Sequence, residues 1–290
     1  MKTHIGWSCE FYKNTGEGQL ARKFINKYFK NKNVKIITPK SNFYLSQYVY
    51  QIYGIFVLWK YYFKGERLIY LNYLPLWNFI IFLLSPPKTI FGPITGSIQI
   101  NRINNIKSIV RYFLMPFLYR ISLIILNFRA KKIIFATNLL IRFVSKNIKK
   151  KIKLNFVYDD FNYKNYLIKR KKKYDLIVYY RKHENKFFSH HMVFIKKQIK
   201  LGKKVLIIGD KINIKNLKQL KRINKNKVSK FIRQSKFALS GDDNLFSLFN
   251  LECLENKVKI IFNYKLKFQI SKINKKLLKP YNFELQKFTK

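Results

Sequence analysis

Cysteine is scarce in this sequence, which has 290 residues and two cysteines, Cys9 and Cys253. The two lie far apart along the chain and make no disulfide framework, so a reducing compartment is the simpler expectation. Histidine is also rare, and no group of cysteines and histidines has the spacing of a zinc site. Residues 1–18 contain no apolar run of the kind found in a signal peptide. These absences predict a cytoplasmic protein without a metal site.

Acidic residues are scarce as well. The chain has 13 Asp and Glu against 60 Lys and Arg, which gives a formal net charge of +47. Such a charge indicates an acidic partner, and the candidates are nucleic acid, anionic lipid and negatively charged small molecules. A bias toward Lys, Asn, Ile, Phe and Tyr, which AT-rich coding produces, explains part of the excess. Because 48% of the residues are hydrophobic and 17% are aromatic, global disorder is excluded.

Uninterrupted apolar runs of membrane-spanning length are missing. The two most apolar segments, Leu68–Ser85 and Ile109–Phe128, are broken by proline and by polar or charged residues. Buried helices are the expected structure, and a basic, aromatic element lying on a membrane surface is the alternative. The aromatic segments Tyr44–Phe63 and Arg111–Tyr119, together with the basic excess, predict peripheral association with an anionic membrane surface through the first domain.

Strand and helix patterns alternate along the whole chain, which is typical of the α/β class. A strongly basic stretch, Asn162–Lys173, has the composition of a linker. We therefore expect two α/β domains, residues 1–165 and 166–290. The C-terminal stretch Ile273–Lys290 is expected to form a terminal helix.

The first half opens with a strand at His4–Ser8, a loop that carries Gly16 and Gly18, and a helix at Gln19–Phe29. This order is typical of a nucleotide-binding-type half, although a single Gly-x-Gly is a weak signal and most such pairs are turns. Further on, a strand at Thr89–Phe91 runs into a loop that contains Gly92, Pro93, Thr95 and Gly96. A loop of this composition suits either close approach by a substrate or a tight turn.

The most informative stretch lies in the second half, between Ser235 and Asn263. It contains a short apolar strand, a turn cluster at Gly241–Asn244, a helical pattern from Leu245 and a second strand, which together make one βαβ unit. The first turn of such a helix offers unpaired backbone N–H groups and a positive dipole end, and both suit a phosphate. Glu252 on this helix is either an acceptor for sugar hydroxyls or a residue at the solvent edge of an ordinary helix.

Two cations follow the first strand of the second half. Arg181 and Lys186 lie in the loop after the strand that begins at Tyr174. Arg presents a planar fork to phosphate oxygens and Lys a point charge, so the pair suits a diphosphate. In a chain this basic, the same spacing also arises by chance.

Both motifs resemble the donor site of GT-B glycosyltransferases, particularly the retaining family four. In that family an acidic residue precedes a Glu by eight positions, as Asn244 precedes Glu252 here, and an Arg and a Lys follow a strand, as Arg181 and Lys186 do. Asn244 stands where the family has its first Glu, and the family's glycines beside the Arg are absent. The resemblance implies two Rossmann-like domains that face each other across a cleft, with the acceptor on the first domain and the donor on the second.

The resemblance also implies an activity and a set of residues. The activity is metal-independent, retaining transfer from a nucleotide-diphosphate sugar to a cell-surface glycan or lipid-linked acceptor, without a cofactor. The implied residues are Arg181 and Lys186 for catalysis, Gly16, Gly18, Gly241, Asn244, Leu245, Ser247 and Glu252 for the donor, and Gly92, Pro93 and Thr95 for an acceptor-side loop. The pairs Asp159–Asp160 and Asp242–Asp243 are adjacent, unlike the spaced pair of metal-dependent enzymes. A basic nucleic-acid-binding protein is the alternative, but no helix-turn-helix, zinc-finger or RNA-binding signature is present, so no specific nucleic acid is expected.

Overall fold

The fold is described by a computed structural model of the whole chain. It describes residues 3–39, 47–72, 74–95, 106–137, 139–154, 156–157, 172–181, 189–214, 217–241, 245–263, 266 and 282–284. The chain divides into two compact units, Met1–Asp159 and Asp160–Lys290. The domain boundary predicted from the sequence lies a few residues later, after residue 165.

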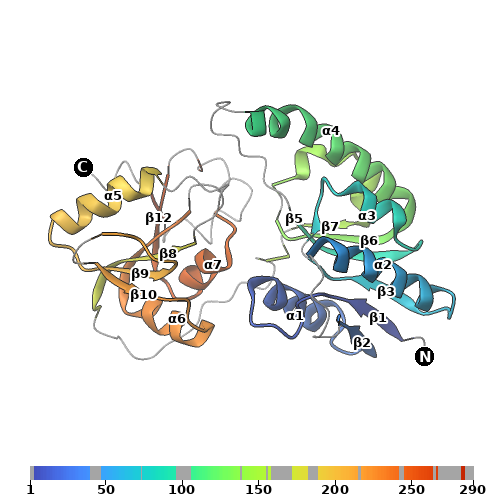
Figure 1. Cartoon of the computed structure of the whole chain (residues 1–290), viewed down its shortest axis with the longest axis horizontal. Coiled ribbons are helices and arrows are strands. Elements are labelled where there is room, and N and C mark those ends of the chain that lie inside the picture. The colour runs from blue at the N-terminus through green and yellow to red at the C-terminus, as the bar shows by residue number, and fades with distance from the viewer. Residues whose placement is uncertain are drawn as a thin grey trace. The chain divides into compact units, whose positions relative to one another are not determined.

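The first unit is built around one parallel sheet (Figure 1). Its strands are β1 (His4–Trp7), β2 (Val34–Ile37), β3 (Arg67–Tyr70), β4 (Leu74–Pro75), β5 (Thr89–Thr95), β6 (Ala130–Phe135) and β7 (Ile152–Lys153). The spatial order is β2-β1-β3-β5-β6-β7, and the short β4 pairs with β5. The register places Gly6 of β1 beside Ile36 and Ile69.

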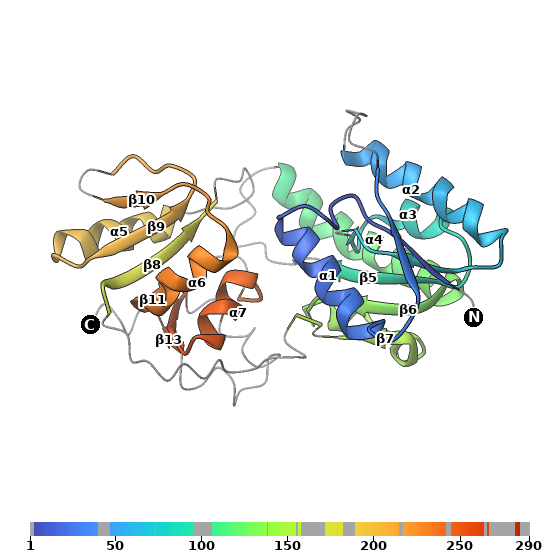
Figure 2. The same ribbon diagram turned by 90° about the horizontal axis from the view of Figure 1, so that it is seen from below.

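Helices cover both faces of this sheet (Figures 1 and 2). They are α1 (Gly16–Tyr28), α2 (Gln47–Tyr62), α3 (Phe79–Leu84) and α4 (Ile106–Arg129), with short 3-10 helices at Ile141–Phe143 and Ile148–Lys151. α1 buries Phe24 against one face, where its ring meets Phe156 edge to face at 5.7 Å. The other face holds the main core, in which Leu58 of α2, Phe82 of α3 and Leu126 of α4 are fully buried.

The second unit repeats the plan with a second parallel sheet (Figure 2). Its strands are β8 (Tyr174–Tyr180), β9 (Val205–Gly209), β10 (Lys218–Leu220), β11 (Ser235–Leu239), β12 (Lys259–Phe262) and β13 (Asn282–Glu284), and its helices are α5 (Ser189–Lys200), α6 (Lys225–Arg233) and α7 (Leu248–Glu255). The order is β10-β9-β8-β11-β12-β13. Phe194 and Ile195 of α5 pack in the core on one face, and α6 and α7 lie together on the other. The predicted α/β class with two Rossmann-like units is confirmed.

Three predicted elements are wrong in detail. Gly92 and Pro93 are not in a loop after a strand, because they are buried inside β5, which continues to Thr95. The apolar residues of Leu154–Val157 also predict a strand, but the strand observed there is β7, Ile152–Lys153, and Phe156 and Val157 donate their backbone N–H groups to carbonyls at the end of β6. Residues 282–284 of the predicted terminal helix form β13, which pairs with β12.

Candidate functional site

The second sheet has the strand order of a dinucleotide-binding α/β fold. Numbered along the chain, its strands lie in the order 3-2-1-4-5-6. The strands β9 and β10 therefore lie on one side of β8, whereas β11, β12 and β13 lie on the other. These two neighbouring strands are hydrogen-bonded in parallel, and Val178 pairs with Leu239. In open α/β sheets, ligands bind in the crevice beyond the carboxyl ends of such a pair. The candidate site therefore lies where β8 ends at Tyr180 and β11 ends at Leu239.

The end of β8 is held closely to the end of β9. Asp210 donates its backbone N–H to the carbonyl of Tyr180 at 3.0 Å. Gly209 has a φ of +126°, and a Cβ built there would lie 1.9 Å from the same carbonyl oxygen, so only glycine fits. Arg181 follows directly and is exposed. The backbone that carries Arg181 is thereby fixed, while its side chain faces solvent.

Aromatic stacking links β8 to the helix after β11. The rings of Tyr179 and Phe249 stack with centroids 5.7 Å apart and an interplanar angle of 27°. Tyr179 immediately precedes Tyr180, and Phe249 lies in the first turn of α7. This contact places the amino end of α7 beside the end of β8, and it brings Arg181 and the first turn of α7 to the same edge of the sheet.

The side chain of Asn250 forms hydrogen bonds with residues that precede α7. This side chain is fully buried, and its amide nitrogen donates to the hydroxyl of Ser240 at 2.9 Å and to the carbonyl of Leu245 at 3.1 Å. Ser247 caps the helix, because its hydroxyl accepts the backbone N–H of Asn250 at 3.1 Å. Two of the predicted donor residues thus have structural contacts: Ser247 caps α7, and Leu245 is buried.

Replacing Asn250 with Ala should lower the free energy of unfolding by about 1–3 kcal/mol, because two buried hydrogen bonds, to the Ser240 hydroxyl and the Leu245 carbonyl, are lost. Urea unfolding measured by circular dichroism gives this value. Asn226→Ala is the matched control, since Asn226 is exposed on α6 and should change stability by less than about 0.5 kcal/mol. Equal stability of the two variants would contradict the role of Asn250.

Glu252 lies at the interface of two helices. Only 6% of this residue is exposed, and its Oε1 accepts a hydrogen bond from the hydroxyl of Ser229 on α6. Its backbone carbonyl accepts from the Asn256 side chain at 2.6 Å. Glu252 is therefore not the solvent-edge residue of the alternative interpretation. A ribose contact remains a prediction, and the Ser229 bond gives the carboxylate a second role that the spacing in the sequence could not reveal.

Several predicted residues lie outside the described part of the chain: Lys186, Asn244, and the neighbours of Asn244 at Asp242 and Asp243. Gly241 is described and directly follows Ser240 at the end of β11. Gly16 and Gly18, which were predicted to contact the donor from the first unit, both lie in the first turn of α1, and Gly16 begins that helix. A Cβ at Gly18 would come within 2.3 Å of the Glu10 carbonyl oxygen, so close packing alone requires glycine there.

The predicted acceptor-side loop needs correction. Gly92 and Pro93 are buried in the middle of β5, where a Cβ at Gly92 would lie 2.7 Å from the ring of Phe24 of α1, so both residues belong to the core rather than to a substrate surface. Thr95 ends β5 and is half-buried at the carboxyl edge of the sheet. Of the three residues, Thr95 alone has a position that fits the prediction.

A pair of polar residues in the first unit was missed. The strand order of the first sheet reverses between β1 and β3. Just after these two strands, the side-chain oxygen of Asn72 accepts a hydrogen bond from the backbone N–H of Cys9 at 2.6 Å. Burial raises the pKa of the Cys9 thiol to about 11, so it stays a thiol at neutral pH. The available signal was positional, because Cys9 and Asn72 each follow a short apolar strand.

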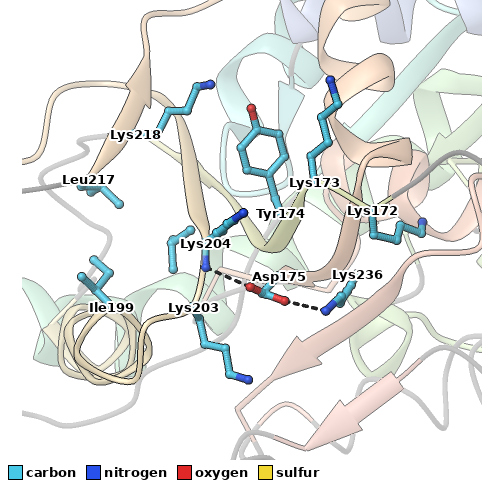
Figure 3. A pocket seen from close by; sticks show the side chains of 11 residues that line it. Lys172, Lys173, Tyr174, Asp175, Ile199, Lys203, Lys204, Leu217, Lys218 and Lys236 are labelled. Carbon is cyan, nitrogen blue, oxygen red and sulfur yellow. Dashed lines mark hydrogen bonds and ion pairs between the residues drawn. The ribbon is translucent and has the colours of Figure 1, made fainter.

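A cavity of about 880 Å³ opens at the opposite, amino-terminal edge of the second sheet (Figure 3). Six lysines line it, Lys172, Lys173, Lys203, Lys204, Lys218 and Lys236, around the single carboxylate of Asp175. Asp175 pairs with the Lys236 ammonium at 2.8 Å and accepts the Lys204 backbone N–H at 2.9 Å, and these contacts hold the pKa of its carboxyl below the ordinary value. This cavity is separate from the candidate site, since Tyr174 begins the strand that Tyr180 ends.

The described residues also bear on metal binding and on membrane insertion. No three His, Cys, Asp or Glu side chains in that part of the chain come together as a metal site would require. None of its helices is long and apolar enough to cross a membrane.

No family model and no curated protein matches the sequence. Among solved structures, similar chains include a Listeria monocytogenes protein classed as a UDP-N-acetylglucosamine 2-epimerase, at 8% identity and a TM-score of 0.46 over 90% of this chain and 78% of that one. An α-glucosyltransferase solved with UDP and a 13-mer DNA has 11% identity and a TM-score of 0.42 over 91% and 81%. The kitacinnamycin glycotransferase has 7% identity and a TM-score of 0.45 over 97% and 85%. At these values an assignment of activity depends on the chain's own residues.

Proposed function

We propose that this chain is a GT-B glycosyltransferase that transfers a sugar from a nucleotide-diphosphate sugar to a cell-surface glycan or lipid-linked acceptor, with retention and without a metal. The second unit holds the donor and the first unit serves the acceptor. The observation that carries the proposal is the carboxyl edge of the second sheet at β8 and β11. Arg181 directly follows β8 and the first turn of α7 follows β11 at this edge, which is a topological switch point.

The chemistry of this edge suits a departing diphosphate. Breaking a sugar–phosphate bond builds negative charge on the phosphate oxygens, and preorganised donors act most strongly where that charge develops. Arg181 supplies a planar guanidinium, and the first turn of α7 supplies backbone N–H groups and a positive dipole end. Lys186, five residues after Arg181 in sequence, is the proposed second cation, and the donor's ribose is assigned to Glu252.

A panel of nucleotides tests the donor site. UDP, GDP, ADP and CMP are each added to the protein, and the unfolding temperature is measured. A nucleotide present at about 100 times its dissociation constant should stabilise the protein by about 2.7 kcal/mol. The diphosphate of one base should give a clear shift, and that base identifies the donor nucleotide. No response to any nucleotide, together with strongly salt-dependent binding to DNA or RNA, would instead support the nucleic-acid-binding alternative that the charge of +47 favours.

Removal of divalent cations should leave the reaction intact. The proposed site neutralises the leaving group with Arg181 and Lys186, so release of nucleotide from the donor sugar should continue at a similar rate in EDTA. The measurement compares initial rates with and without EDTA, and then after magnesium or manganese is restored. Complete loss in EDTA that either metal reverses would contradict the metal-independent mechanism.

A further inference from the structure

One side of the first unit exposes an apolar surface formed by three helices. Apart from Tyr12, Tyr179, Val193 and Leu201, all the exposed large hydrophobic residues in the described part of the chain lie between Val49 and Phe128. They belong to α2, α3 and α4 and the residues beside them, and these helices lie together on one face of the first sheet (Figures 1 and 2). α3 packs against both α2 and α4, so the surface is continuous.

The exposed residues follow helical spacing on the outer side of each long helix. In α4, Tyr119, Leu123 and Leu126 face the core, while the exposed stripe consists of Phe113, Phe117, Ile124 and Phe128. In α2, Ile55 and Leu58 face the core, while the exposed stripe consists of Val49, Ile52, Phe56 and, just after the helix, Phe63. A surface helix of a globular protein normally has charged or polar residues at such positions. Contiguous exposed apolar surface of this kind marks an interaction site.

Each exposed stripe contains a cation at the position where the spacing would place another apolar residue. Lys60 occupies it in α2 and Arg120 in α4, and both are exposed. No Asp or Glu occurs in the sequence between Glu66 and Asp159, and none occurs in α2. A face that combines large apolar side chains with long cations and no carboxylates matches a lipid surface with anionic headgroups, since the cations reach the headgroups while the rings enter the acyl boundary. A second copy of the chain fits poorly, because it would bring two basic faces together.

We propose that the α2–α3–α4 face of the first unit binds the surface of anionic lipid bilayers. Phe56, Phe113, Phe117 and the α3 residues Ile80 and Leu83 enter the interface, and Lys60 and Arg120 contact the headgroups. The proposed contact is peripheral. This inference does not depend on the proposed sugar transfer, since lipid binding is measured without donor or acceptor.

Vesicle sedimentation tests the proposal on the full chain. The protein should pellet with phosphatidylcholine–phosphatidylglycerol vesicles far more than with phosphatidylcholine alone, and salt should release it. Phe113→Ser combined with Phe117→Ser should reduce the partition coefficient at least tenfold. Val193→Ser combined with Leu201→Ser is the matched control, because both residues are exposed in the second unit, and it should bind as wild type does. Lys60→Gln and Arg120→Gln should each weaken binding to anionic vesicles about fivefold.

Fluorescence identifies the surface independently. All three tryptophans lie in the first unit, and Trp77, beside α3, is 37% exposed whereas Trp7 is fully buried. Vesicles with brominated acyl chains should quench the emission of the wild type, and Trp77→Phe should reduce the quenching, with the half-buried Trp59 of α2 supplying the remainder. If the double variant with Phe113→Ser and Phe117→Ser folds poorly, Phe56→Ser on α2 replaces it in the sedimentation experiment. The proposal is overturned if the face and control variants bind the vesicles equally, or if detergent releases the protein and salt does not. It is also overturned if the face variants change only a monomer–dimer equilibrium.

Discussion

Arg181→Ala should lower the rate of sugar transfer by about a hundredfold or more, on the scale seen when one oxyanion donor is removed. The reason lies in its position: the backbone at Tyr180 is fixed by the Asp210 N–H and by the close approach of Gly209, and the exposed guanidinium follows at once. The anchored backbone brings the Arg181 side chain to the edge where the leaving diphosphate is proposed to bind. Lys186→Ala should have an effect of similar size. Initial rates of nucleotide release from the donor sugar measure both.

Two further variants separate this role from a general loss of charge. Arg181→Lys should recover only part of the rate, because the bidentate fork is lost while the charge is kept. Arg222→Ala should be nearly neutral, since Arg222 lies after β10, is exposed, and pairs with Asp210 at 2.8 Å. The affinities for a nucleoside diphosphate and monophosphate give a second readout: Arg181→Ala should lose the preference for the diphosphate. Near-wild-type rates in both alanine variants would overturn the assignment.

The order of the elements could be predicted from the sequence because the buried strands are short runs of apolar residues. β8, β9 and β12 are examples, and each is bounded by polar residues. The same rule failed at β5, because Pro93 has no N–H for the ladder and proline inside a strand usually indicates its end. It also missed β7 and β13, which are two and three residues long and lie at the edges of their sheets. Edge strands are half-solvated, so their sequences carry little apolar signal.

The candidate site was predictable in position but not in its contacts. The strand–loop–helix pattern located the end of β11, and parallel pairing then brings Tyr180 and Leu239 to one edge. The stacking of Tyr179 on Phe249 joins residues that are far apart in sequence, so no local pattern contains it. The aromatic segments of α2 and α4 could be identified from the sequence, but the side of each helix that is exposed could not. A helix that is apolar on all sides has no periodicity that distinguishes its core side from its outer side.

Glu252→Ala should weaken binding of the preferred nucleotide by about 1.5–3 kcal/mol, or roughly 10- to 150-fold, if the carboxylate accepts hydrogen bonds from the ribose. Isothermal titration calorimetry with the diphosphate that gives the largest thermal shift measures this loss. The buried Ser229 bond supplies a competing explanation, because a carboxylate that joins α6 to α7 would affect binding only through stability.

Ser229→Ala distinguishes the two explanations, because it removes the bond between α6 and α7 and keeps the carboxylate. It should lower the free energy of unfolding by about 1 kcal/mol and leave nucleotide affinity unchanged. Glu252→Gln keeps an oxygen that can accept the Ser229 hydroxyl but loses the charge, so it should remain nearly as stable as wild type and bind nucleotide less tightly. If Glu252→Ala binds nucleotide as wild type does and loses only stability, then Glu252 holds two helices together and the ribose contact lies elsewhere.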